Sequence, residues 1–302
     1  MKIVVAGGTG FMGEPLVRRL VARRDDVTVL TRNPDKVEAG RGVRWDGRTQ
    51  GVWSADAASA DVVINLAGEN IGEGRWTQER KKRLVDSRLN ATHAIVEALK
   101  RDPSRKRTMI NASAIGFYGD RGDETLDESS PRGDSFLADL VDRWETAARD
   151  AEPLARLVIV RFGVVLGPDG GALKQMLLPF KLGAGGPIGN GRQWMSWVDR
   201  EDALRVVEWA IDNERARGIY NATAPEPVRN RDFARALGRA LHRPAILPAP
   251  AFALRLAFGE MAEELLLAGQ RVLPKRTTGD GFMFERATLE SSLAAVIRAA
   301  SG

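Results

Sequence analysis

Residues 2–20, KIVVAGGTGFMGEPLVRRL, place Gly7, Gly10 and Gly13 between a short apolar run and a segment of helical periodicity. The glycines have the spacing G-x-x-G-x-x-G, which lets a backbone turn tightly and approach a pyrophosphate group. The helix that follows presents free N–H groups and the positive end of its dipole to such an anion. This stretch therefore predicts a dinucleotide site that opens a Rossmann-type unit. The residues expected in this turn are Gly7, Thr9, Gly10, Phe11, Met12 and Gly13.

Short runs rich in Val and Ile alternate with longer helical segments along the first half of the chain. This alternation is typical of βαβ units around a parallel sheet, so we expect a Rossmann-like, doubly wound α/β fold. Strands are expected over residues 2–6, 27–30, 43–45, 62–66, 108–112 and 157–162. Helices are expected over residues 11–24, 77–100 and 135–150.

After residue 163 the chain contains Gly-rich and Pro-rich breaks such as GPDGG and GAGGPIGNG. We expect a cofactor domain over residues 1–165, to which later strands return. Residues 166–302 would mostly form a smaller C-terminal substrate lobe, with a C-terminal extension at about residues 248–296. Within that extension, residues 251–269 contain apolar positions in helical phase and predict one apolar helix that ends at Gly269.

The composition limits the classes of function. The chain has 302 residues, a net charge of +5 with both signs interspersed, no Cys and two His. These features favour a small-molecule partner over nucleic acid and predict no metal site. The absence of a signal peptide and of a long apolar run predicts no membrane contact and, by default, a cytoplasmic location. The oligomeric state stays open, a homodimer included.

The second expected strand ends in VTVLTRNPDK, where an NAD enzyme normally has Asp or Glu for the ribose 2′-hydroxyl. Thr31 and Arg32 stand there instead. A guanidinium group suits a 2′-phosphate, so the sequence favours NADP(H) over NAD(H). A solvated arginine at a strand end is the competing interpretation.

The fourth expected strand runs into NLAGENI, whose small residues Ala67 and Gly68 allow close approach of the backbone to a cofactor. Glu69 and Asn70 follow at the carboxyl end of that strand, where ligands of open α/β sheets bind. Both are candidate substrate contacts.

Taken together, GGTGFMG, NLAGENI, RWTQERKKRLVDSRLNAT, NASAIGFYG, RFGVVLGP and SWVDRED resemble the extended short-chain dehydrogenase/reductase superfamily. Within it the chain is most similar to the atypical NAD(P)-dependent epimerase family of the 39U type, which carries a C-terminal domain of unknown function. The resemblance extends over essentially the whole chain, including GEMAEELLLAGQRVLPKR.

The resemblance implies positions for the cofactor and the substrate. NADP(H) would lie at the Gly-rich turn, with its 2′-phosphate at Thr31 and Arg32. In the same way Arg192 and Trp197 match places where related sugar-nucleotide enzymes contact substrate, and Asp199 and Asp202 match a structural element. The remaining implied cofactor contacts are Leu66, Ala67 and Gly68 near the ribose, and Arg88, Gly163 and Val164 at the nicotinamide half.

Ordinary members of this superfamily carry Tyr-x-x-x-Lys on a helix, because residues i and i+4 share a face and the cation lowers the Tyr pKa. Here Tyr118 is followed four residues later by Gly122, and Tyr220 by Ala224, so this chain has no such pair. In the expected helix, the places of Tyr and Lys are taken by Leu137 and Val141, or by Phe136 and Leu140 in the adjacent register.

Three interpretations remain open. The first is an epimerase-like or oxidoreductase-like protein of atypical mechanism acting on an unidentified small molecule, with Ser113 holding a substrate oxygen and Tyr118 or Glu69 as proton donor. The second is a non-catalytic NADP(H)-binding regulator, for example one linked to cell division. The third is another small-molecule protein that reuses the pocket. Packing alone also accounts for Ser113 and Tyr118.

Overall fold

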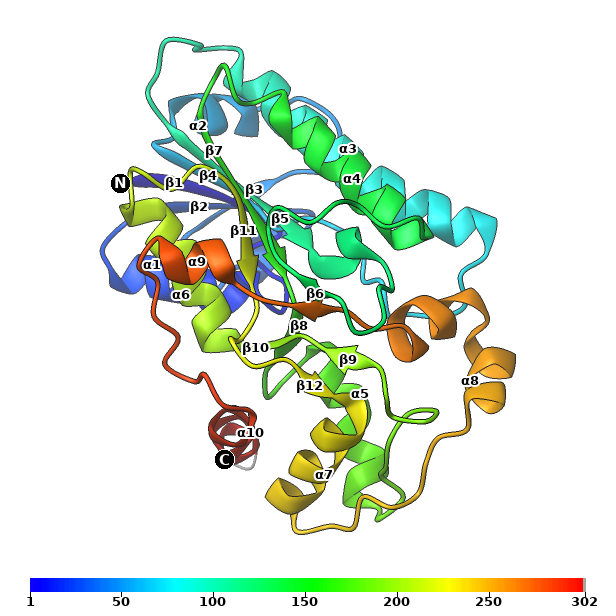
Figure 1. Ribbon diagram of the computed structural model, residues 1–302. Helices are drawn as coiled ribbons and strands as arrows, with labels where there is room; N and C mark the ends of the chain where they lie inside the picture. The colour runs from blue at the N-terminus through cyan, green and yellow to red at the C-terminus, as the bar shows by residue number, and fades with distance from the viewer. Residues whose placement is uncertain (301–302) are drawn as a thin grey trace.

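The structure is a computed structural model that describes residues 1–300, and its centre is a seven-stranded parallel sheet (Figure 1). The strand order is β11-β7-β5-β4-β1-β2-β3, and the order reverses between β1 and β4. This confirms the Rossmann-like fold, in which ligands bind beyond the carboxyl ends of the strands at such a reversal. The strands are β1 (Lys2–Ala6), β2 (Asp26–Thr31), β3 (Arg41–Arg44), β4 (Val62–Asn65), β5 (Thr108–Ala114), β7 (Arg156–Phe162) and β11 (Gly218–Ala222).

Helices cover both faces of the sheet. On one face, Ile3 and Val5 of β1 pack against α1 (Gly13–Ala22) and α6 (Arg200–Asp212). On the other face, Val4 and Ala6 share a core with α2 (Trp53–Ser59), α3 (Gln78–Leu99) and α4 (Phe136–Arg149). Because both faces are buried, the central strands β1 and β4 are almost continuous apolar runs and do not alternate with polar residues.

A smaller lobe lies below the sheet in Figure 1 and has its own core, which contains Trp197, Phe233 and Leu293. Its elements are β8 (Val164–Leu166), α5 (Gly171–Lys181), β9 (Trp194–Met195), β10 (Trp197–Asp199), β12 (Val228–Arg229), α7 (Asn230–Leu241) and α10 (Leu289–Ala299). The shorter elements between and beside the two cores are η1 (Pro34–Lys36), η2 (Ile115–Tyr118), β6 (Thr125–Leu126), α8 (Ala251–Phe258), η3 (Ala262–Leu267), β13 (Arg271–Val272) and α9 (Lys275–Gly279).

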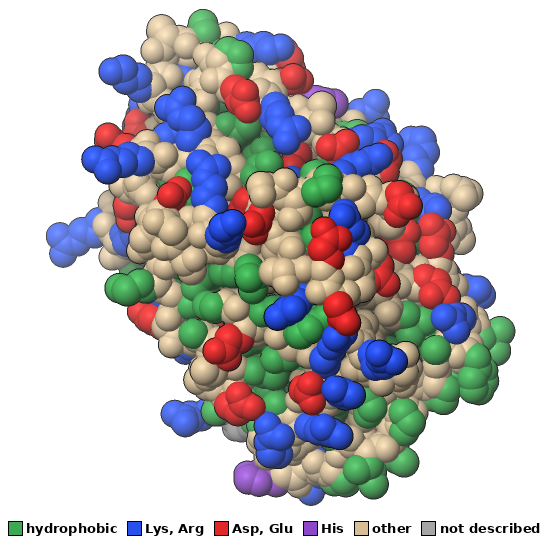
Figure 2. Space-filling model, in the orientation of Figure 1, with side chains coloured by type: hydrophobic (Ala, Val, Ile, Leu, Met, Phe, Trp, Pro, Cys, Tyr) green, Lys and Arg blue, Asp and Glu red, His purple; other side chains and the backbone are tan. Residues whose placement is uncertain are grey.

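The apolar helix expected at residues 251–269 is two separate elements. Gly259 adopts a φ of +60°, which ends α8, and the π-helical turn η3 follows it. Phe252 and Leu256 of α8 are largely exposed. Figure 2 shows apolar side chains gathered toward the lower right of this face, where Figure 1 places α8. Along residues 1–300, no helix combines the length and the apolar character needed to cross a bilayer.

Two buried carboxylates on either side of the start of α6 fix the C-terminal segment to the rest of the molecule. Asp199 accepts hydrogen bonds from the side chains of Arg286 at 2.9 Å and Ser292 at 2.7 Å. Asp202 accepts the backbone N–H groups of Glu285 at 3.0 Å and Arg286 at 2.8 Å. This matches the structural role that the sequence resemblance implies for both residues.

Replacing Asp202 by Ala leaves two partly buried backbone N–H groups without an acceptor and is expected to cost about 2 kcal/mol of unfolding free energy. Asp212→Ala on the same helix is the matched control, because its carboxylate is 58% exposed and its ion pair with Arg23 contributes less than about 1 kcal/mol. Urea denaturation of the two variants measures the difference. Equal losses would contradict the role assigned to Asp202.

Candidate cofactor and active site

The Gly-rich turn packs against the end of β4 and leaves no room for side chains. Gly7 has a φ of +77°, and a Cβ atom on it would lie 2.8 Å from the carbonyl carbon of Leu66. A Cβ atom on Gly13 would lie 2.1 Å from the carbonyl oxygen of Gly7. The turn, the start of α1 and Leu66–Ala67 therefore meet at the point where the strand order reverses. This backbone cradle fits a dinucleotide pyrophosphate.

Phe11 connects this turn to the loop that precedes α5. A Cβ atom on Gly167, Gly170 or Gly171 would lie 2.7, 2.4 or 3.0 Å from its ring. The Arg200 guanidinium carbon is 5.1 Å from the ring centroid. Gly167, Gly170 and Gly171, which the sequence predicts only as turn residues, therefore leave the space that the Phe11 ring occupies.

Arg88 lies at the other end of the cradle, beside Gly68. Its guanidinium group donates hydrogen bonds to the carbonyl oxygens of Leu84 at 3.0 Å and Glu69 at 3.1 Å. It also lies 5.2 Å from the centroid of the Trp144 ring. Burial lowers the pKa of Arg88 to about 10, so it is still a cation at neutral pH. It supplies positive charge next to the β4 loop.

Gly163 and Val164 follow β7 and lie against β10. A Cβ atom on Gly163 would lie 2.4 Å from the carbonyl oxygen of Ser196, and Val164 pairs with Trp197 in a parallel bridge. Trp197 itself is fully buried and donates through Nε1 to the carbonyl oxygen of Glu226. The expectation that Trp197 offers a ring face to substrate is therefore wrong, because that ring forms the core of the small lobe.

Trp194 is the partly exposed tryptophan of this segment. The guanidinium carbons of Arg229 and Arg271 lie 4.1 and 4.7 Å from its ring centroid, and its Nε1 donates to Asp123 at 2.9 Å. Arg192 is exposed nearby, and its predicted contact with substrate stays a prediction. Sequence alone could not choose between two tryptophans three residues apart.

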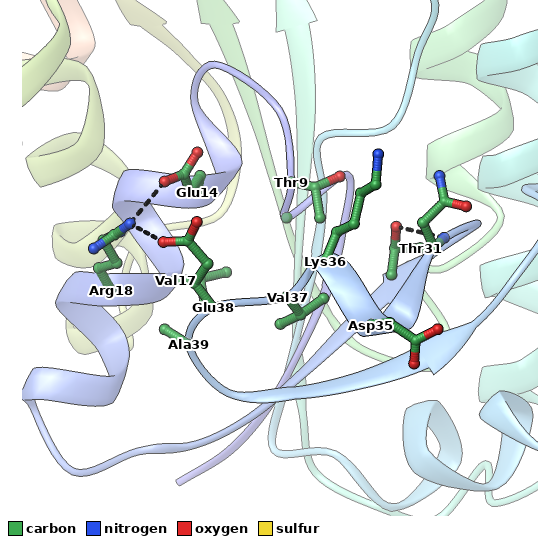
Figure 3. A pocket seen from close by; sticks show the side chains of 12 residues that line it. Thr9, Glu14, Val17, Arg18, Thr31, Asp35, Lys36, Val37, Glu38 and Ala39 are labelled. Atoms are coloured by element: carbon green, nitrogen blue, oxygen red, sulfur yellow. Dashed lines mark hydrogen bonds and ion pairs between the residues drawn. The ribbon is translucent and has the colours of Figure 1, made fainter.

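A cavity of about 560 Å³ lies at the carboxyl end of β2, between α1 and the η1 segment (Figure 3). Thr9 of the Gly-rich turn and Thr31 line it. Arg32 is exposed and lies outside the lining, so its contact with a 2′-phosphate also stays a prediction. The lining residues are Gly8, Thr9, Glu14, Val17, Arg18, Thr31, Asn33, Asp35, Lys36, Val37, Glu38 and Ala39.

The two hydroxyl groups expected to be catalytic belong to a buried ionic network. Ser113 donates a hydrogen bond of 2.6 Å to Glu145, and Arg161 binds both oxygens of the same carboxylate at 2.7 Å. Arg161 also donates to the Tyr118 oxygen at 3.0 Å, while the Tyr118 hydroxyl donates to Asn221 at 2.8 Å. All five side chains are buried. The hydroxyls of Ser113 and Tyr118 therefore have protein partners and do not face solvent.

The surroundings of Tyr118 make its hydroxyl a poor base. Burial raises the pKa of Tyr118 to about 12, although the neighbouring Arg161 opposes that shift. On α4, Leu137 and Val141, which the sequence resemblance matches to the Tyr and Lys of ordinary members, are buried apolar residues. One turn further along, Glu145 binds Arg161. Sequence reasoning missed Arg161, yet an arginine inside the buried strand segment VIVRF requires an ionic partner.

Glu69 and Asn70 lie beyond β4, as expected, but their side chains have local partners. The Glu69 carboxylate accepts hydrogen bonds from Arg80 and lies 3.8 Å from Arg83. Asn70 accepts from the backbone N–H of Gly72 and so closes its own turn. The Glu69 carboxylate is therefore paired with two guanidinium groups, and its role as proton donor stays a prediction.

Removal of Glu145 is expected to destabilise the protein strongly, because Arg161 would be left buried without a counter-charge. Glu145→Ala should cost about 3–5 kcal/mol of unfolding free energy, measured by urea denaturation. Asp139→Ala on the same helix is the control, since its carboxylate is 53% exposed. The double variant Glu145→Leu with Arg161→Met should recover most of the loss. A loss no larger than that of the control would contradict the network.

Comparison with known proteins identifies two regions. Residues 3–223 match the NAD dependent epimerase/dehydratase family, and residues 249–296 match the domain of unknown function DUF1731. The epimerase family protein YfhF of Bacillus subtilis is 39% identical over 306 residues, which cover 98% of this chain and 98% of the relative.

Solved structures give the same result. The crystal structure of human epimerase family protein SDR39U1 (isoform 2) with NADPH is similar with a TM-score of 0.91 and 36% identity, covering 99% of each chain. MoeE5 in complex with UDP-glucuronic acid and NAD has a TM-score of 0.77 and 19% identity over 99% of this chain and 98% of its own, and shares the fold. The chain therefore belongs to the NAD-dependent epimerase/dehydratase family and carries a C-terminal DUF1731 domain.

Proposed function

We propose that this protein binds NADP(H) and acts as an oxidoreductase-like or epimerase-like protein on a small molecule. The observation that carries the proposal is the cradle formed by Gly7, Gly13 and Leu66, in which a Cβ atom added to Gly7 or Gly13 would collide with backbone. A backbone packed so closely is needed where a pyrophosphate approaches it. The human relative of 36% identity that was crystallised with NADPH supports the same ligand.

Several features support NADP(H) over NAD(H). Strand β2 ends at Thr31 and is followed by Arg32, so the carboxylate that would bind a ribose 2′-hydroxyl is absent from these two positions. A cation at the same place suits a 2′-phosphate. The predicted contacts at the nicotinamide half, Arg88, Gly163 and Val164, belong to the same proposal.

Bound NADPH would supply a hydride. The protein would supply the backbone cradle, the positive charge of Arg88 and an apolar wall on α4 that excludes water, with Leu137 and Val141 among its residues. Because Glu145 and Arg161 bind the hydroxyls of Ser113 and Tyr118, we propose that these two groups support the fold and do not transfer protons. A positioned general acid contributes roughly 10²–10⁴ to a rate, so turnover without one should be slow.

The second candidate is an NADP(H)-binding protein without turnover, which reports nucleotide state to a partner. The same network favours it, because a site with both hydroxyls bound internally needs rearrangement before either can meet substrate. The two candidates share the cofactor and differ only in the reaction.

Incubation of the full chain with NADPH and a broad panel of aldehydes, ketones and keto-sugars separates the two candidates. We expect slow oxidation of NADPH, followed by its absorbance, and Ser113→Ala should keep the rate within about tenfold of the wild type, well short of the loss of a general acid. NADPH binding by the variant controls for folding.

If the wild type binds NADPH and oxidises it with no carbonyl compound, the oxidoreductase-like activity is refuted. An epimerase-like activity, which returns the hydride and oxidises no net NADPH, is then tested with NADP⁺ by following the conversion of one sugar epimer into the other, and if no epimer forms only the regulator remains. If Ser113→Ala abolishes a measurable rate while NADPH binding is unchanged, Ser113 takes part in the reaction, and the proposal that its hydroxyl only supports the fold is wrong.

Arg32→Glu is expected to weaken NADPH binding much more than NADH binding, because a carboxylate repels a 2′-phosphate and can accept from a ribose hydroxyl. Dissociation constants of both nucleotides, measured by calorimetry, test this. Equal losses for NADPH and NADH would show that Arg32 does not contact the 2′-phosphate.

A further inference from the structure

Lys36 extends into the cavity at the end of β2, toward Thr9 and Thr31 (Figure 3). Its backbone belongs to η1, whereas Asp35 of the same short helix points to the other side. Within residues 1–300 the Lys36 ammonium group has no hydrogen-bond or ion-pair partner. The cavity therefore contains a cation whose charge is not yet used.

Arg18, the other cation in the lining, is already bound. Its guanidinium group forms ion pairs with Glu14 at 3.0 Å and with Glu38 at 2.5 Å. The hydrogen bond to Glu14 and the charge of Glu38 both raise the pKa of Arg18. Two carboxylates thus compensate one guanidinium group, which leaves little positive charge for a further anion.

The charges of the side chains that line the cavity suit an anionic ligand only when Lys36 is present. Asp35 points away from the cavity, whereas Glu14 and Glu38 both pair with Arg18. Without Lys36 these two carboxylates would outnumber the single guanidinium group, and a phosphate would be repelled. With Lys36 in place, a phosphate near Thr9 and Thr31 finds an ammonium group and two hydroxyl donors.

We propose that Lys36 binds the adenosine 2′-phosphate of NADP(H) and sets the preference of this protein for NADP(H) over NAD(H). This inference rests on the proposed NADP(H) site and adds a residue on η1 to the expected pair at the end of β2. Arg32 and Lys36 are both exposed, but only Lys36 lines the cavity, where it points toward Thr9 and Thr31.

Lys36→Gln removes the charge and keeps much of the length of the side chain. We expect the dissociation constant of NADPH to rise about tenfold or more, as for the loss of a charge-assisted hydrogen bond, while that of NADH changes less than about twofold. Lys106→Gln is the matched control, because Lys106 is exposed next to the amino end of β5, whereas the cavity lies at the carboxyl end of β2. Thermal unfolding checks that both variants fold.

Competition by 2′,5′-ADP and 5′-AMP isolates the adenosine end from the rest of the cofactor. The wild type should bind 2′,5′-ADP more tightly than 5′-AMP, and Lys36→Gln should lose most of that difference while Lys106→Gln keeps it.

The inference is overturned if Lys36→Gln weakens NADPH and NADH equally, or if it leaves NADPH binding and the preference for 2′,5′-ADP unchanged. A wild-type chain that binds neither nucleotide would instead refute the proposed function itself, and the inference with it.

Discussion

The ion pair between Arg161 on β7 and Glu145 on α4 constrains the region beyond the end of β5. A buried guanidinium group and a buried carboxylate are tolerated only when their remaining hydrogen-bonding atoms are satisfied. Ser113, Tyr118 and Asn221 meet that requirement. The network therefore holds α4 against the sheet and at the same time gives the hydroxyls of Ser113 and Tyr118 partners within the protein.

The cofactor half of the site is built differently. The Gly-rich turn is shaped by close backbone packing at Gly7 and Gly13, and the Phe11 ring packs it against the small lobe. The shape of the turn therefore depends little on polar side chains. Side-chain charge enters at its two ends, through Arg88 beside β4 and Lys36 beside β2. This division explains how the chain can keep a nucleotide site while the Tyr-x-x-x-Lys pair is absent.

Sequence periodicity predicted the sheet and its principal helices because buried parallel strands and amphipathic helices leave regular patterns. The turn at Gly7 was predictable for a similar reason, since its geometry demands glycine. The partners of Ser113 were not predictable, because Glu145 and Arg161 lie 32 and 48 residues away and meet only in the folded chain. The predicted substrate contact of Trp197 was wrong because its ring is buried in the core of the small lobe, which is assembled from segments distant in the sequence. The sequence predicted one apolar helix where the structure has α8 and η3, because the apolar residues keep their helical phase across Gly259.

Under the proposed function, an NADP(H) cradle coexists with hydroxyls that are bound within the protein. A crystal structure of the full chain grown with NADPH tests this combination. We expect the pyrophosphate at the Gly-rich turn, the 2′-phosphate between Thr31 and Lys36, and Ser113 still hydrogen-bonded to Glu145. A nucleotide bound away from that turn, or a Ser113 hydroxyl turned from Glu145 toward the nicotinamide, would contradict it.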